Sequence, residues 1–253
     1  MIAMIKLLTF NIRVPNFNDD GVNFWHYRAP RVFQKLREES PDVIGFQEVR
    51  DETFPQLKFN LSEYTFLGYG RDAHFFGESA RIAFKSELFQ LQAMDQFWLS
   101  DTPRVPGTRF ENQSGCNRVC VWAKLMHLPT QKRFYFMNTH LDHRGDEARL
   151  KGLQLIFDMV KKLKAEDDLP VFIVGDFNFM PEEAPYALIR ENGFNDLTEG
   201  MEGTFHGYGK TSEKIDYILT DLPKEQFEIR RWHENNNGVY LSDHDPIAAF
   251  WKD

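Results

Sequence analysis

Five short segments of this chain each carry a polar side chain of the kind that binds metal ions or moves protons, and in four of them an apolar strand-type run comes first. A strand buried on both faces is continuously apolar, so the polar residue falls where the strand would end. A sheet that brings several such ends to one edge forms a site for a hard metal ion and a phosphate. The polar residues are Asn11 after LLTF, Glu48 after VIGFQ, His140 after FMNT, Asp176 and Asn178 after IVG, and Asp243 with His244 near the C-terminus.

Strand-type runs and helical patterns alternate along the chain, which indicates an α/β or α+β layered domain. Apolar residues between 150 and 163 follow the three-four spacing of one helix face. Two further helices are expected at 24–39, closed by Ser40-Pro41, and at 182–192, stopped by Gly193. Residues 98–118 are polar and rich in turn formers, which predicts a long loop. Strands are predicted at 5–10, 42–48, 80–84, 119–127, 133–139, 170–175, 215–220, 225–232 and 246–251.

Composition sets broad limits on the class of protein. With 253 residues and 42% hydrophobic content, the chain can bury a large core, and we expect one domain over 1–253. Two cysteines, Cys116 and Cys120, are too few for a disulfide framework and form a poor zinc motif. The N-terminus lacks the features of a signal peptide, and no apolar run is long enough to span a membrane. We therefore expect a cytoplasmic protein with no membrane contact and no obligate protein partner.

The overall charge is acidic, with a formal net charge of −8 and an isoelectric point of about 5.5. Proteins that grip duplex DNA non-specifically usually present a basic surface, because neutralised phosphates supply most of the affinity. The charge therefore argues against a strong non-specific DNA binder. It does not exclude a nuclease, since a local basic groove can exist on an acidic protein.

The polar residues suggest chemistry even when each segment is taken alone. Asp176 could orient or deprotonate water, and the amide of Asn178 could donate to a developing oxyanion. An Asx-turn after a strand would explain the same pair without function. Asp243-His244 offers an oxygen ligand beside an imidazole, although the pair also suits a plain turn before Pro246. Glu48 would be costly to bury unpaired, so a cation or a surface position has to account for it.

Taken together and in order, these motifs resemble those of the endonuclease/exonuclease/phosphatase superfamily. The resemblance runs from residue 7 to residue 250 and implies a four-layer α/β sandwich, in which two packed mixed β-sheets are flanked by helices. It also implies a phosphoester hydrolase that uses Mg²⁺ or Mn²⁺. The matching residues are Asn11, Gln47-Glu48, Asn138-Thr139-His140, Gly175-Asp176-Phe177-Asn178, Asp216 in KIDYI and Ser242-Asp243-His244.

The resemblance assigns metal-binding roles to three residues. Glu48 is similar to the principal metal ligand of the superfamily, with Asn11 beside it. Asp243 lies near a possible second metal position.

Further roles follow for the catalytic residues. Asp176 resembles the carboxylate that orients the attacking water, and Asn178 the amide that steadies the pentavalent transition state. His244 resembles the imidazole that contacts the phosphate or activates water, and Asp216 the aspartate that orients it. His140 is similar to the second histidine of the nuclease and sphingomyelinase branches. Glu78 falls where the family often pairs a glutamate with that histidine.

The loops between the motifs predict a rim of cationic and aromatic groups for an extra phosphate, a sugar or a base. Solvated arginines and a packed tryptophan would explain the same residues without function. The candidates are Trp98, Arg104, Arg109 and Arg118 in the long loop, His143 and Arg144 after the His140 strand, and Phe205 and His206 in GTFHG.

These loops resemble a bacterial branch of the superfamily that lies nearer the deadenylase-like proteins than the abasic endonucleases, which have tyrosine in place of His140. We expect a substrate that is a small phosphorylated metabolite, a nucleotide or a short single-stranded nucleic acid, with a DNA or RNA nuclease as the alternative. A glycosidase could pair Glu48 with Asp176 but would not need the other residues. A non-catalytic phosphate-binding scaffold would normally have lost a metal or base residue, and none is missing.

Overall fold

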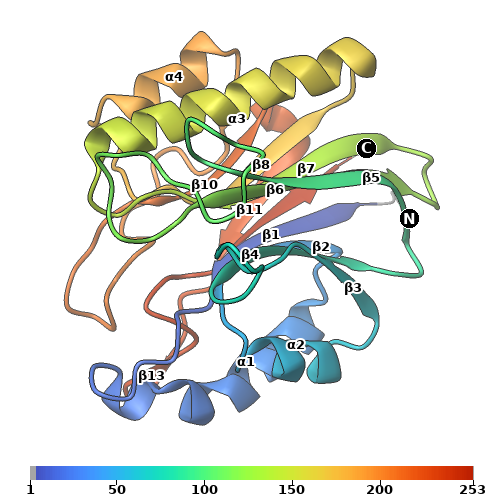
Figure 1. The fold of residues 1–253 in the computed structure, drawn as a ribbon. Helices are drawn as coiled ribbons and strands as arrows, with labels where there is room; N and C mark the ends of the chain where they lie inside the picture. The colour runs from blue at the N-terminus through green and yellow to red at the C-terminus, as the bar shows by residue number, and fades with distance from the viewer. Residues whose placement is uncertain (1–3, 253) are drawn as a thin grey trace.

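The computed structural model describes residues 4–252 and has four layers (Figure 1). Two six-stranded mixed sheets pack face to face. Helices α1 (Trp25–Glu39) and α2 (Phe54–Asn60) cover the outer face of one sheet, and α3 (Asp146–Glu166) and α4 (Pro185–Glu191) cover the other. The predicted four-layer α/β sandwich is confirmed.

The first sheet joins the two ends of the chain, because β1 pairs antiparallel with β14. Strand β1 also pairs in parallel with β2, and the remaining neighbours in this sheet are antiparallel. The strand order is β11 (Phe227–Arg231), β14 (Ile247–Trp251), β1 (Ile5–Asn11), β2 (Val43–Val49), β4 (Ser79–Lys85), β3 (Tyr64–Leu67).

The second sheet repeats this pattern, with one parallel pair, β7 and β8, among antiparallel neighbours. Its order is β5 (Phe89–Trp98), β6 (Val119–His127), β7 (Arg133–His140), β8 (Val171–Asp176), β10 (Asp216–Thr220), β9 (Asn195–Asp196). A small hairpin of β12 (Asn235–Asn236) and β13 (Val239–Tyr240) and two short 3₁₀ helices, Gly21–Asn23 and Lys224–Gln226, complete the described elements.

Both faces of the central strands are buried, which explains why they are almost continuously apolar. In β1, Leu7 packs between the sheets while Leu8 packs under α1. The two sheets approach closely at Gly45, where an added Cβ would lie 2.4 Å from Val174 Cγ2. Glycine is therefore required at this position by packing.

Most predicted elements are present, including the helix predicted from the spacing between 150 and 163, which is α3, and the strands that carry the motifs. Sequence patterns missed β3, β5 and α2. Strand β5 is exposed over Gln90–Ala93, where glutamines alternate with Leu91 and Ala93, so it lacks the continuous apolar run of the central strands. The predicted loop holds for residues 99–118, but Trp98 is the last residue of β5.

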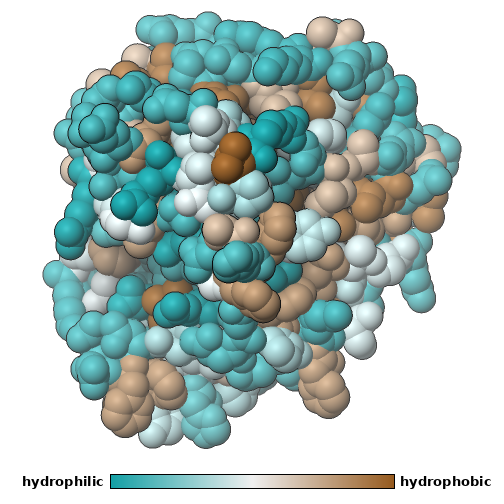
Figure 2. All heavy atoms as spheres, viewed as in Figure 1, coloured by the Kyte–Doolittle hydropathy of each residue, from teal (hydrophilic) through white to brown (hydrophobic). Residues whose placement is uncertain are grey.

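The strand directions bring the motif residues to one edge. In the first sheet, the parallel strands β1 and β2 end at this edge and the antiparallel strand β14 begins there. In the second sheet, the parallel strands β7 and β8 end at this edge and the antiparallel strand β10 begins there. In Figure 1 this edge lies on the side away from the two termini. The face drawn in Figure 2 is mostly hydrophilic, with apolar side chains in small scattered groups. No helix within residues 4–252 is both long enough and apolar enough to cross a bilayer.

Candidate active site

A cavity of about 380 Å³ lies at the edge where the motif-bearing strands converge. Sequence motifs separated by up to about two hundred positions therefore contribute to one concave surface, as expected for a ligand site. Ten predicted residues line it: Glu48, Glu78, Arg118, His140, His143, Asp176, Asn178, Phe205, Asp243 and His244.

Glu48 is held in the cavity by hydrogen bonds to both carboxylate oxygens. Asn11 Nδ2 donates to Glu48 Oε1 at 3.0 Å, and the backbone N–H of Val14 donates to Oε2 at 2.7 Å. Burial alone would raise the pKa of Glu48, but the Val14 hydrogen bond, the charge of His244 and the Asn11 hydrogen bond together lower it. The carboxylate is thus kept ionised.

Glu48 also has an unusual backbone, with a φ of +61° beside an irregularity in the β2–β4 register. Asn178 has a φ of +51°. Left-handed conformations are uncommon for such residues and concentrate at functional sites, where the surrounding structure enforces them. Both strained residues line the cavity.

Asp176 is the centre of the buried network. Its Oδ2 accepts a hydrogen bond from Asn11 Nδ2 at 3.0 Å and lies 3.4 Å from His140 Nε2 and 3.7 Å from His244 Nε2. Burial, followed by the charges of Asp216 and Glu48, raises the pKa of Asp176 to about 7. A carboxylate with this pKa can accept a proton near neutral pH.

The two histidines of the cavity differ in charge. Asp216 Oδ2 lies 2.9 Å from His244 Nδ1. Burial lowers the pKa of His244, but the carboxylates of Asp216 and Asp176 outweigh it and raise the pKa well above its ordinary value. Burial, with the charges of Arg118 and Arg71, lowers the pKa of His140 well below its ordinary value. Asp176 Oδ2 therefore lies within 4 Å of one histidine whose surroundings favour the neutral form and one whose surroundings favour the protonated form.

Asn178 and Glu78 both line the cavity. The backbone N–H of Asn178 donates to Asp176 Oδ1 at 3.0 Å, which forms the Asx-turn, and its Nδ2 donates to Leu141 O at 3.1 Å. Glu78 Oε1 lies 3.7 Å from His140 Nδ1, beyond hydrogen-bonding distance, and that nitrogen has no hydrogen-bond partner. Glu78 pairs instead with Arg71.

A cationic wall faces these carboxylates. Arg118 is buried, with Nη2 3.0 Å from His143 Nδ1 and Nη1 3.6 Å from Glu78 Oε1. Its Nε has no hydrogen-bond partner. Guanidinium groups with free donors bind phosphate or carboxylate oxygens. Arg118 and His143 therefore lie where the rim was predicted.

The other predicted rim residues, apart from Phe205, lie outside the cavity lining. Trp98 is buried in β5, where its Nε1 donates to Arg71 O at 2.6 Å, so the tryptophan packs and supports the Arg71 loop. Arg109 and Arg144 are exposed and do not line the cavity, and exposed Arg104 pairs with Asp95. His206 is buried in a separate cluster. Its neighbour Phe205 does line the cavity, with its ring centroid 4.7 Å from that of His244.

Two basic residues that sequence reasoning missed also line the cavity, Arg13 and Arg71. Arg13 Nε lies 3.3 Å from Asp20 Oδ1 and 3.5 Å from Asp243 Oδ2. The only sequence signal for Arg13 is that it follows Asn11 by two positions. Arg71 precedes Glu78 in a loop between strands, and nothing in its spacing marks it as functional.

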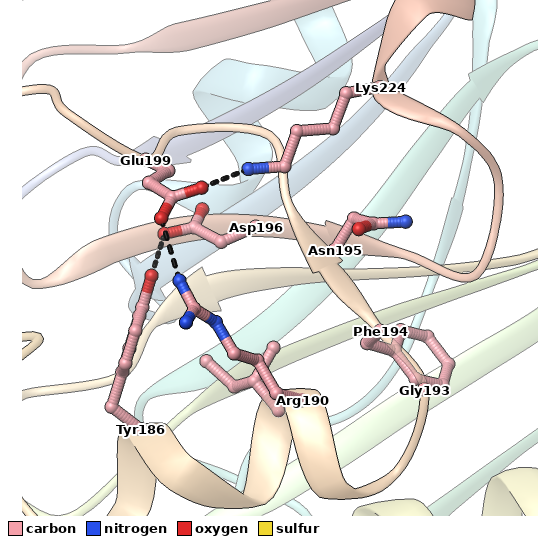
Figure 3. A pocket seen from close by; sticks show the side chains of 9 residues that line it. Tyr186, Arg190, Gly193, Phe194, Asn195, Asp196, Glu199 and Lys224 are labelled. Carbon is pink, nitrogen blue, oxygen red and sulfur yellow. Dashed lines mark hydrogen bonds and ion pairs between the residues drawn. The ribbon is translucent and has the colours of Figure 1, made fainter.

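A second cavity, of about 390 Å³, lies between α4 and β9 (Figure 3). Glu199 pairs with Lys224 and lies 2.8 Å from Arg190, while Tyr186 Oη donates to Asp196 at 3.2 Å. Because these charged groups are already paired with one another, we assign no catalytic role to this cavity.

The residues of the first cavity fit a hard divalent cation. Glu48, Asp176 and Asp243 all line it, and Glu48, Asp176 and His140 offer ligand atoms within 4.8 Å of one another. Burial and the charge of Glu48 raise the pKa of Asp243, a sign of repulsion among buried carboxylates that a cation would relieve. Asn11 Nδ2 donates hydrogen bonds to the carboxylates of Glu48 and Asp176. The Oδ1 of Asn11 accepts a hydrogen bond from the backbone N–H of Arg13.

A four-layer α/β sandwich with carboxylates and histidines gathered at one sheet edge is the arrangement of the DNase I-like hydrolases. A model of the Endonuclease/Exonuclease/phosphatase family matches residues 8–244. The chain belongs to this family, whose members hydrolyse phosphoester bonds.

Solved structures of the family are similar over their whole length. An endonuclease/exonuclease/phosphatase from Bacteroides vulgatus is 31% identical, with a TM-score of 0.88 and 99% of each chain covered. A mannosyl-6-phosphatase from Bacteroides thetaiotaomicron is 26% identical, with a TM-score of 0.85 and 97% of this chain and 98% of that chain covered. A probable RNA exonuclease of Saccharomyces cerevisiae, NGL3, is 26% identical over 73% of this chain, which spans 39% of that relative.

Proposed function

We propose that this chain is a divalent-metal-dependent phosphoesterase that hydrolyses a phosphate mono- or diester by in-line attack of water. The observation that carries the proposal is the position of Asp176, which is buried, has its pKa raised to about 7 and lies within 4 Å of both His140 and His244. A proton acceptor between a neutral and a cationic imidazole suits the activation of water beside a developing anion.

In this proposal each group has one task. Asp176 orients the attacking water and accepts its proton. His244, kept protonated by Asp216, donates a hydrogen bond to a phosphoryl oxygen. Neutral His140 contacts the leaving oxygen. Mg²⁺ or Mn²⁺ bound by Glu48 would neutralise charge on the phosphoryl group.

The substrate we propose is a small phosphorylated metabolite, a nucleotide or a short single-stranded nucleic acid. A cavity of about 380 Å³ suits a ligand of that size. Arg118 and Arg71 both line the cavity and supply cationic groups for a second polar part of the ligand. The mannosyl-6-phosphatase neighbour supports a small phosphomonoester. The yeast relative favours the alternative, a nuclease acting on RNA or DNA.

The test is a substrate screen on the purified full-length chain. It compares p-nitrophenyl phosphate, bis-p-nitrophenyl phosphate, sugar phosphates, mononucleotides, oligo(A) and plasmid DNA, each with Mg²⁺, with Mn²⁺ and with EDTA. Cleavage of the small esters supports the proposal, and plasmid nicking at low protein concentration supports the nuclease alternative.

Variants assign the activity to the cavity. Glu48→Ala and Asp176→Ala should each lower kcat/KM by about 100-fold or more. Matched controls are Glu63→Ala and Asp158→Ala, which change exposed carboxylates outside the cavity and should keep full activity. Full activity of Glu48→Ala protein in EDTA would overturn the metal assignment.

A further inference from the structure

A second group of metal-type side chains lies outside the cavity. His206, His233 and Asp245 each offer a ligand atom, and these atoms lie within 4.8 Å of one another. None of the three lines the catalytic cavity. The proposed hydrolysis uses none of them, so the cluster needs an explanation of its own.

The spacing of the cluster matches that of a metal site. Asp245 Oδ1 lies 3.3 Å from His206 Nε2 and 3.2 Å from His233 Nδ1. Tetrahedral zinc with bonds of about 2.0–2.1 Å holds its ligand atoms roughly 3.3 Å apart. Asp245 Oδ1 therefore already stands at ligand spacing from one nitrogen of each ring.

The cluster is also a built site. His206 is 5% exposed and Asp245 is 4% exposed, and the His206 ring packs 4.8 Å from the ring of Tyr240. The Nε2 of His206 faces Asp245, while its Nδ1, on the other side of the ring, is buried without a hydrogen-bond partner. His233 is half exposed and leaves the site open to solvent.

One cation already lies near Asp245 and has to be accounted for. Arg231 Nε is 3.4 Å from Asp245 Oδ2, and the same guanidinium donates through Nη1 to Glu202 O. Arg231 thus contacts Asp245 Oδ2, the oxygen that His233 Nδ1 also approaches at 2.9 Å, whereas His206 faces Oδ1. A group that holds the outer oxygen of a ligating carboxylate is a common supporting contact in metal sites.

We propose that His206, His233 and Asp245 bind a divalent transition-metal ion of the zinc class at a site separate from the catalytic cavity. Two imidazoles and one carboxylate favour Zn²⁺, Co²⁺ or Ni²⁺, whereas Mg²⁺ prefers all-oxygen ligands. The exposed side of His233 leaves room for water as the fourth ligand.

The site adjoins the catalytic residues through the backbone. The N–H groups of His206 and Gly207 donate to Asp243 O at 2.9 and 3.1 Å, and Asp245 N donates to Thr204 O at 2.8 Å. Phe205 and His244 lie between these bonds and face the cavity. An ion that joins His206 to Asp245 would fix the same two segments that carry Asp243 and His244.

The experiment measures binding on the full-length chain, with saturating Mg²⁺ to occupy the cavity. Isothermal titration with Zn²⁺, and the visible absorption of bound Co²⁺, are compared for the native protein and His233→Ala. The control is His26→Ala, which removes another exposed histidine. We expect His233→Ala to lose one Zn²⁺ equivalent, or to bind it about 10-fold or more weakly, and to lose the Co²⁺ spectrum. The control should bind as the native protein does.

Equal Zn²⁺ stoichiometry and affinity in the native protein and His233→Ala would overturn the proposal and leave the cluster as an ion-paired group. Thermal unfolding gives a second readout, since Zn²⁺ that binds only the folded state raises Tm in the native protein and not in the variant. Neither measurement uses hydrolysis, so the result stands whatever the outcome of the substrate screen.

Discussion

Asp142→Asn tests how the loop beside the cavity is held. The Asp142 carboxylate is buried at the start of α3, with Oδ1 accepting from the backbone N–H groups of Ser114 at 3.1 Å, Arg144 at 3.0 Å and Gly145 at 2.7 Å. Its Oδ2 accepts from the Ser114 hydroxyl and lies 3.8 Å from Arg118 Nε. Asparagine keeps the shape and the Oδ1 acceptor, so the substitution removes mainly the charge.

The pKa of Asp142 gives the size of the effect. Burial would raise that pKa, but the Ser114 and backbone hydrogen bonds outweigh it and lower the pKa from 3.8 to about 2. A shift of this size corresponds to about 2 kcal/mol in favour of the folded state at neutral pH. For a chain of this size the loss would lower Tm by roughly 5–10 °C.

The sign of the pH dependence follows from the direction of the shift. Because the folded-state pKa is depressed, the stabilisation is complete well above pH 4 and disappears as pH falls through about 2. The difference in unfolding free energy between native protein and Asp142→Asn should therefore be about 2 kcal/mol at pH 7 and about half of that at pH 3.

Urea denaturation at pH 7, 4 and 3 measures this difference directly. Asp158→Asn is the matched control, because Asp158 is an exposed aspartate of α3, and it should change stability by less than about 0.5 kcal/mol. A difference below about 0.5 kcal/mol for Asp142→Asn at pH 7, or one that stays constant down to pH 3, would refute the idea that this charge stabilises the loop.

Two further substitutions test the site and the packing beneath it. Asp216→Asn leaves His244 Nδ1 without its carboxylate and should lower kcat by about 100-fold or more with little change in KM; an unchanged kcat would remove Asp216 from the mechanism. Gly45→Ala places a Cβ 2.4 Å from Val174 Cγ2 and 2.9 Å from Asn138 Oδ1, and should cost about 1–3 kcal/mol in urea denaturation. Native-like stability of Gly45→Ala would show that the sheets can separate at little cost.

The sequence predicted the strands of the site well because they are buried on both faces. Each reads as a short apolar run that ends in a polar residue, and strand direction then brings those ends together. The pairing of Asp216 with His244 was predicted by resemblance and is present at 2.9 Å. Half-buried elements such as β5, in contrast, lack a clear repeat of apolar residues along the sequence and were missed.

Loop residues could be predicted only in part, because their positions depend on tertiary contacts that no local pattern records. Trp98 appeared suited to a substrate rim, yet it packs at the end of β5 and holds Arg71 by a hydrogen bond to its carbonyl. Arg71, which reaches the cavity, carried no motif. The cationic wall is thus built from residues whose sequence context is that of ordinary loops.

The net charge of −8 is compatible with the cationic wall of the cavity because acidic and basic side chains line different parts of it. Glu48 and Asp176 lie on the side where the strands end, while Arg71 and Arg118 lie on the loops opposite. A phosphate could not bind the carboxylate side alone, since like charges in a buried site repel strongly. With a divalent cation on that side, the same anion would meet positive charge from both directions. Local arrangement therefore decides anion binding here, and the total charge of the chain does not.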